Sequence, residues 1–249
     1  MSIVVDYSTD VSNVGSPLLE LVQQVCDELM ISRPTVVASS TDPQTRQLFA
    51  LLNRLGTDIA RQYPWQSLNR EYVITTVADQ TAYALPADWQ SQIPQTEWDR
   101  TNRWPLLGPQ SPQNWQSFKS GIVYAGPRER FRIQGNMINV MPAPPAGLQF
   151  SFEYISSGWV NSALGVAQSR YLLDSDYAVY PDSLLITGLK TQWKAAKGLD
   201  AGFDLAEFAS LIEKMKAQDQ SAPKLSLSPY SRSVLLSVAN IADAGYGRE

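Results

Sequence analysis

The stretch TDPQTRQLFALLNRLGTDIARQYPW, residues 41–65, decides the fold expected for the N-terminal part of the chain. Asp42 can cap a helix, and Pro43 occupies the first helical position, where a missing N–H costs no hydrogen bond. Pro64 ends the run. The apolar side chains between them recur at helical spacing, as Leu48, Leu51, Leu52, Leu55, Ile59 and Tyr63. The stretch therefore predicts an amphipathic helix that needs a partner for its apolar stripe.

A second helix is expected immediately upstream. Ser16 is a candidate cap and Pro17 a candidate first helical residue, which is the same kind of start. Arg33-Pro34 is expected to end this helix, because a residue before proline disfavours helical backbone angles. Its apolar positions follow helical spacing, as Leu18, Leu21, Val22, Val25, Leu29 and Met30. Together the two helices predict a helical hairpin.

The pattern changes to strands in the middle of the chain. EYVITTV, residues 71–77, is rich in β-branched side chains, and TAYALP, residues 81–86, offers a short partner. Alternating segments flank Gly135-Asn136, a pair that can adopt positive φ in a hairpin turn. LQFSFEYIS, residues 148–156, alternates apolar with polar side chains and predicts a half-buried strand. One short helix is expected from Ser111.

Helical spacing returns after Pro181. The first helix there is expected to end at Gly198, which can adopt the left-handed conformation common at helix ends. Its apolar face would hold Leu184, Leu185, Leu189, Trp193 and Ala196. The next helix is expected to place one apolar stripe inward, made of Phe203, Leu205, Phe208, Leu211, Ile212 and Met215.

These elements predict an α+β fold. N- and C-terminal helix pairs, residues 17–69 and 174–220, are expected to form one helix bundle, because each pair has an apolar stripe to cover. An inserted antiparallel β domain is expected over residues 70–173. Residues 1–16 would form an N-terminal arm, and residues 221–249 an extended C-terminal arm.

Composition excludes several function classes. The 249 residues contain no histidine and one cysteine, so Ser-His-Asp or Cys-His catalysis, imidazole or thiolate metal sites and an intrachain disulfide are not expected. The net charge of −4 does not favour nucleic-acid binding, although mild acidity suits a surface past which DNA slides. We expect no membrane span, since no apolar run approaches about 20 residues. We also expect no secretory signal, and therefore synthesis and assembly in the cytoplasm.

Three kinds of side chain remain as candidates for chemistry or binding. Asp174 and Asp176, with Asp182 nearby, could bind a hard cation, but acidic residues leading into a helix start explain them better. Seven tryptophans could offer a stacking platform, although core or interface packing is the favoured interpretation. Basic side chains along the helices either form a solvated face or contact neighbouring subunits; they include Arg46, Arg54, Lys190 and Lys194.

Several segments together resemble the head-to-tail adaptor proteins of podophages, relatives of the tail tubular protein A group. The similar segments are STDPQTRQLFALLNRLGTDIARQYPWQSL (40–68), TEWDRTNRWPLLGPQSPQNWQ (96–116), FRIQGN (131–136), FEYIS (152–156) with the following Trp159-Val160, and LLITGLKTQWKAAKGL (184–199). They occur in the family's order. The resemblance runs from about Leu18 to about Leu227, so residues 1–16 extend beyond the family's usual start.

The resemblance implies a structural virion protein and not an enzyme. Family members form a dodecameric ring between the portal and the tail nozzle, through which DNA passes without specific binding. Tail fibres are a further expected partner, and no cofactor or metal is implied. The resemblance also implies that the C-terminal arm contacts the portal. We expect this contact at Leu225, Leu227, Tyr230, Val234, Leu235, Leu236, Val238, Ile241 and Tyr246.

Contacts between subunits, or with nozzle and fibres, are expected at Arg46, Arg54, Lys190, Lys194, Trp98 and Trp104. Two rival functions stay open. A tail-associated carbohydrate- or fibre-binding module would use Trp98, Trp104 and Trp115. A carboxylate- or metal-dependent hydrolase would use Asp174 and Asp176, and it ranks last because histidine is absent.

Overall fold

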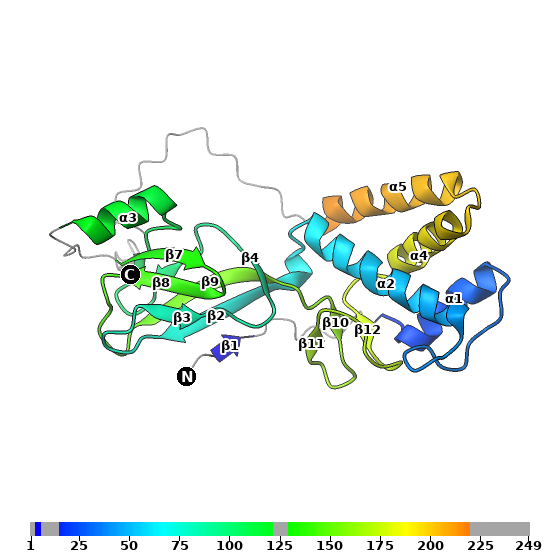
Figure 1. Cartoon of the computed structure of the whole chain (residues 1–249), viewed down its shortest axis with the longest axis horizontal. Coiled ribbons are helices and arrows are strands. Elements are labelled where there is room, and N and C mark those ends of the chain that lie inside the picture. The colour runs from blue at the N-terminus through cyan, green and yellow to red at the C-terminus, as the bar shows by residue number, and fades with distance from the viewer. Residues whose placement is uncertain (1–2, 6–14, 122–128, 220–249) are drawn as a thin grey trace, which may run out of the picture. The chain divides into compact units, whose positions relative to one another are not determined.

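Residues 3–5, 15–121 and 129–219 are described in the structure, a computed structural model (Figure 1). They fall into two compact units, and each is described by itself. The helical unit contains residues 15–69 and 155–219, and the β unit contains residues 3–5, 70–121 and 129–154. Helices together with antiparallel sheets confirm the predicted α+β class.

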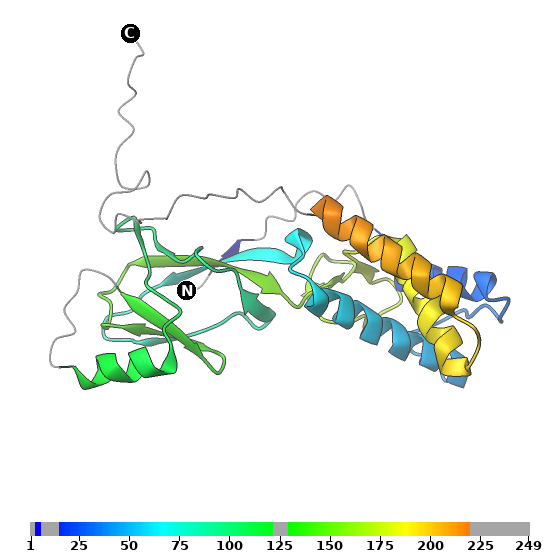
Figure 2. The ribbon, with the colours of Figure 1, turned by 90° about the horizontal axis from the view of Figure 1, so that it is seen from above.

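The helical unit is organised around one helix, α4 (Asp182–Lys197). It packs against α1 (Leu18–Glu28), α2 (Pro43–Gln62) and α5 (Gly202–Asp219). Figures 1 and 2 show α4 and α5 side by side, joined by a short turn. A 3-10 turn, Gln66–Leu68, follows α2. A small sheet in the order β11-β10-β12 completes the unit, with β10 at Val160–Asn161, β11 at Ala167–Gln168 and β12 at Tyr177–Ala178.

The start of α2 is confirmed as predicted. The Asp42 carboxylate accepts the backbone N–H of Thr45 at 2.8 Å, and Pro43 is the first helical residue. The predicted end of α4 is also confirmed, since Gly198 has φ 70° in the left-handed region. These two helix boundaries need only local chemistry, which is why the sequence predicts them.

The predicted start of α1 is wrong by one residue. Pro17 is the cap and the helix begins at Leu18, because Ser16 has a different partner. The Ser16 hydroxyl donates to Asp182 at 2.6 Å, and so ties the start of α1 to the start of α4. The predicted end at Arg33-Pro34 is also wrong. Helix α1 stops at Glu28, and Met30 has a φ of 54°, in the left-handed region, which a helix cannot continue through.

The expected inner stripe of α5 is only partly correct. Phe208 reaches Gly188 of α4, and Ile212 is buried. Phe203 and Leu205, however, are 82% and 56% exposed, and Asp204 between them is buried instead. An acidic side chain has therefore taken the inward position at the start of α5.

Aromatic side chains hold residues 155–173 against the helices. Trp159 and Tyr171 are fully buried, and their rings meet edge to face at 5.3 Å between centroids. The Tyr171 N–H donates to the Asn53 side chain of α2 at 2.8 Å. The sequence grouped residues 155–173 with the β domain, whereas their contacts place them in the helical unit. Burial of the Trp159 and Tyr171 rings against α2 explains why these residues belong to the helical unit.

The β unit contains two antiparallel sheets around one core. The first has the order β1-β2-β9-β5-β6, with β4 also paired to β9, and the second has the order β3-β8-β7. The predicted hairpin at Gly135 is confirmed as β7 and β8, and the predicted strand at 148–156 as β9. The strand bounds are β1 Ile3–Val5, β2 Asn69–Thr75, β3 Ala82–Ala84, β4 Trp89–Gln92, β5 Trp98–Asp99, β6 Trp104–Pro105, β7 Arg130–Gln134, β8 Met137–Met141 and β9 Gln149–Ser156.

Side chains from both sheets fill this core. Tyr72 and Ile74 of β2 meet Phe150, Phe152 and Tyr154 of β9, together with residues from the second sheet. The short helix α3 (Pro112–Ser120) is capped by Ser111 as predicted, and carries the buried Trp115. Residues 3–5, expected to be an arm, pair with β2 as strand β1.

Gly56 provides a stability test of the helical unit. A Cβ at this position would lie 2.1 Å from the Trp159 ring, which cannot move because it is fully buried. Gly56→Ala is therefore expected to destabilise the protein by about 3 kcal/mol or more through overpacking. Gly202→Ala, where the nearest atom is the flexible Asp200 carboxylate at 3.3 Å, is the matched control. Equal midpoints for both variants in urea unfolding would contradict this packing argument.

Candidate interaction surfaces

An ion cluster joins α1, α4 and α5 in the helical unit. Lys190 lies 2.7 Å from the Glu28 carboxylate of α1 and 3.8 Å from Asp204 of α5. Lys194, one turn further along α4, also pairs with Asp204. The hydrogen bond to Glu28 is the largest influence on the pKa of Lys190 and raises it, so this lysine keeps its charge.

This cluster explains why Asp204 and not Phe203 faces α4. Two lysines converge on a carboxylate that is only 5% exposed, so turning Asp204 outward would leave Lys194 without its partner. When α5 is turned about its axis so that Asp204 faces the two lysines, Phe203 and Leu205 are left in solvent. Sequence reasoning missed Asp204, because its partners Lys190 and Lys194 lie on another helix and leave no local signal beside it.

The predicted basic contacts divide into two pairs. Lys190 and Lys194 have partners within the chain, and are committed to holding α5 in place. Arg46 and Arg54 are exposed on α2, and Arg54 forms only a loose pair with Asp58 at 3.9 Å, one turn away. Exposed pairs of this kind contribute little to stability, so these two arginines are free to meet another molecule.

The three clustered aspartates stabilise loops. Asp182 accepts the Ser16 N–H and hydroxyl, and Asp174 accepts the N–H of Ala38 at 2.7 Å. Asp176 accepts the N–H groups of Leu172 and Leu173 at 2.9 and 2.8 Å. The explanation by a helix start therefore fits Asp182 alone.

Within residues 3–5, 15–121 and 129–219, no group of three acidic or sulfur-bearing side chains could hold a metal ion. Burial, followed by the charges of Asp182 and Asp176, raises the pKa of Tyr171 well above its ordinary value. The phenol therefore stays neutral at any physiological pH. The arrangement suits a rigid loop support, and it offers neither a nucleophile with a base nor a cation cage.

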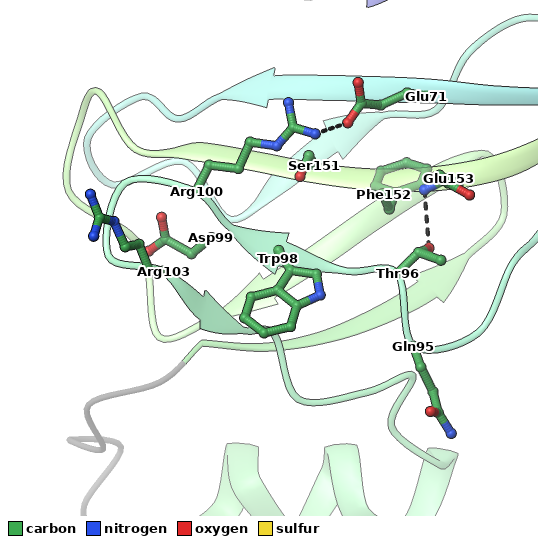
Figure 3. A pocket seen from close by; sticks show the side chains of 10 residues that line it. All are labelled: Glu71, Gln95, Thr96, Trp98, Asp99, Arg100, Arg103, Ser151, Phe152 and Glu153. Carbon is green, nitrogen blue, oxygen red and sulfur yellow. Dashed lines mark hydrogen bonds and ion pairs between the residues drawn. The ribbon is translucent and has the colours of Figure 1, made fainter. Parts of the chain in front are cut away.

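The β unit carries an open groove of about 570 Å³ on one face of its larger sheet (Figure 3). Trp98 of β5 forms one wall and is half-buried, and the Arg100 side chain crosses the groove to the buried Glu71 of β2. Gln95 and Arg103, at its margins, have positive φ values of 69° and 60°. Such conformations are unusual outside glycine and cluster at binding sites.

The predicted tryptophan platform does not assemble. Trp115, a residue of α3, is buried, so it cannot share an exposed surface with Trp98 and Trp104. Trp98 lines the groove, whereas Trp104 is placed on β6 opposite Asp99 and is not among the lining residues. One tryptophan of the three is thus available to a ligand in this groove.

A model of the SU10 adaptor protein family matches residues 16–230, which is most of the chain. The chain belongs to the SU10 adaptor protein family. A search of curated proteins found no match. The expected relationship to phage head-to-tail adaptors is therefore confirmed at the level of the family.

Membership makes this protein a phage adaptor, a structural component of the virion that joins head and tail proteins. That role agrees with the site geometry, in which the described charged clusters stabilise loops and helix packing. No helix in the described part of the chain is long and apolar enough to span a membrane. The nine C-terminal residues predicted to contact the portal, from Leu225 to Tyr246, lie outside the described residues.

Replacing the central carboxylate of the ion cluster tests its role in the adaptor. Asp204→Asn is expected to destabilise the helical unit by about 2 kcal/mol, because the partly buried Lys194 loses its anion and Lys190 keeps only Glu28. Asp58→Asn removes an exposed partner of similar chemistry, and is expected to change stability by less than about 0.5 kcal/mol. Thermal unfolding of both variants makes the comparison, and indistinguishable losses would contradict a structural role for the cluster.

Proposed function

We propose that this adaptor forms a homo-oligomeric ring, a dodecamer, between the portal and the tail nozzle of a short-tailed phage. Genomic DNA passes through the ring without specific binding. The family match over residues 16–230 carries this proposal, because it makes the chain an adaptor. The net charge of −4 is compatible with passage of DNA without specific binding, since like charges repel.

The C-terminal arm is proposed as the portal contact. Residues 221–249 follow α5, which ends at Asp219, and contain the apolar run VLLSVANI at 234–241. An arm that orders on binding gains interface area and loses conformational entropy, so a single arm binds weakly. A ring of such arms binds firmly through multivalency. Leu235, Leu236, Val238 and Ile241 are the proposed anchors.

Exposed arginines are proposed to serve the other contacts of the ring. Arg46 and Arg54 extend from α2 into solvent, where they are available to acidic side chains of a neighbouring subunit or of the nozzle. Lys190 and Lys194 are not assigned to this role, because both are engaged within the chain.

Portal rings and the purified adaptor provide the test. A stoichiometric ring of adaptor on the portal, seen by co-sedimentation and electron microscopy, is the expected result. Deleting residues 234–249 is expected to lower portal binding at least tenfold while leaving the circular dichroism of the folded units unchanged. Failure of the folded full-length chain to bind would overturn the ring proposal. Unchanged binding by the truncated chain would overturn the arm proposal alone.

A second candidate function is recognition of a tail fibre or a carbohydrate by the β unit. The half-buried Trp98 beside Arg103 in the groove favours it, because an aromatic wall with polar neighbours suits a sugar ring or an extended peptide. Glycan-array and fibre-binding signals that disappear in Trp98→Ala but persist in Trp104→Ala would support this function. If these binding signals persist in both variants, the groove is excluded as the binding site.

A further inference from the structure

The groove on the larger sheet of the β unit contains two charged side chains that have no partner of opposite sign (Figure 3). Arg103 and Glu153 are both exposed, and neither forms an ion pair with any described residue. The other charged side chains of the groove are engaged. Arg100 pairs with Glu71, and the fully buried Asp99 accepts two backbone N–H groups of the turn that follows it. One cation and one anion are therefore available to a ligand.

These two charges lie on opposite sides of Trp98 (Figure 3). On β9, Gln149 bonds to the turn that contains Arg103, whereas Glu153 bonds to Thr96, which precedes Trp98. Four residues of β-strand separate the two bonding points, a distance of about 13 Å. The groove therefore suits an extended chain with an acidic side chain at one end, an aromatic ring in the middle and a basic side chain at the other end.

The C-terminal arm contains this pattern in residues 243–248, DAGYGR, which lie outside the described part of the chain. The acidic, aromatic and basic side chains follow in the required order, as Asp243, Tyr246 and Arg248. Five residues of extended chain span about 17 Å, which matches the groove. Glycines on both sides of Tyr246 add no side chain, so the backbone can approach the sheet closely. Asp243 is the one acidic residue of the arm before residue 249, so the pattern occurs once.

The arm begins beside the strand that forms one side of the groove. Asp219, the last residue of α5, accepts the backbone N–H of Gln66 at 2.8 Å. Glu71, which lines the groove, follows five residues after Gln66 and so lies within about 18 Å of it. Residues 220–243 can extend to about 80 Å. The arm is therefore long enough to bring Asp243 to the groove of its own chain.

We propose that residues 243–248 occupy the groove of their own β unit in the unassembled adaptor, and that portal binding displaces them. The proposal rests on the proposed function of the arm as the portal contact, because Tyr246 is assigned to both surfaces and can occupy only one at a time. Competition of this kind lowers the apparent affinity of the arm for the portal by the fraction of time for which the arm is free. A single adaptor therefore binds weakly, whereas many arms on one portal ring still bind firmly.

Disulfide formation in the full-length chain tests the contact and leaves its three anchors unchanged. In a Cys26→Ala background, Gln149→Cys is combined with Ala244→Cys, which places both thiols at one end of the groove. Mild oxidation is expected to close an intramolecular disulfide, seen as a faster monomer on non-reducing gels and confirmed by mass spectrometry of tryptic peptides. The control combines Ala244→Cys with Arg61→Cys, because Arg61 is exposed near the end of α2 and lies outside the groove. It is expected to give at least tenfold less disulfide.

A charge exchange identifies the side chains that hold the arm. In the groove cysteine pair, Arg103→Asp is expected to lower the disulfide yield at least threefold, and adding Asp243→Arg is expected to restore it. Aspartate is among the residues that tolerate the φ of 60° at position 103. Arg61→Asp is the matched control and is expected to leave the yield unchanged. A loss that Asp243→Arg does not restore would overturn the proposed pairing.

Portal rings test the displacement. They are expected to lower the disulfide yield at least threefold when added before oxidation. Trp98→Ala is expected to raise the affinity for the portal about threefold, because the arm is then free for more of the time. A purely structural role for Trp98 would lower this affinity instead. An unchanged yield from adaptor that is bound to the portal would overturn the displacement.

The remaining outcomes separate the groove contact from the proposed function. A groove pair that yields no more disulfide than the control would overturn the contact, even where portal binding is normal. Disulfides found mainly in dimers would overturn occupancy by the same chain, because the arm would then come from a second copy. If the portal is not bound at all, the proposed function fails, and the yield from the adaptor alone still decides the contact.

Discussion

The helical unit depends on the contact between the Trp159 ring and Gly56. The ring occupies the space that any side chain on residue 56 would need, so α2 approaches the segment after β9 more closely than an alanine would permit. Tyr171 and Tyr180 pack on the same indole, at 5.3 and 6.1 Å between ring centroids. The chain that leaves the β unit is thereby fixed to the helices before α4 begins.

Local chemistry accounts for what the sequence predicts. Asp42 with Pro43, Ser111 with Pro112, and Gly198 each specify a helix boundary within a few residues, and the structure has all three as expected. Gly135 likewise specifies the β7–β8 hairpin. The α+β class follows from these boundaries and from the strand pattern between them.

Partners distant in sequence account for the predictions that were wrong. Ser16 caps nothing, because Asp182 accepts its hydroxyl from 166 residues away. Phe203 faces solvent because Lys190 and Lys194 draw Asp204 inward. Neither pairing leaves a local pattern in the sequence. The groove beside Trp98 was equally hidden, since it joins β2, β5 and β9 through the sheet order.

The order of the larger sheet ends on a very short strand at either end. Strand β1 pairs with β2 along three residues, and at the other end β6 has two residues, of which Pro105 has no N–H to offer. An uncovered edge invites strands from other molecules to pair with it. Strand β1 thus leaves only three residues of backbone along which a strand of another molecule could pair at this edge.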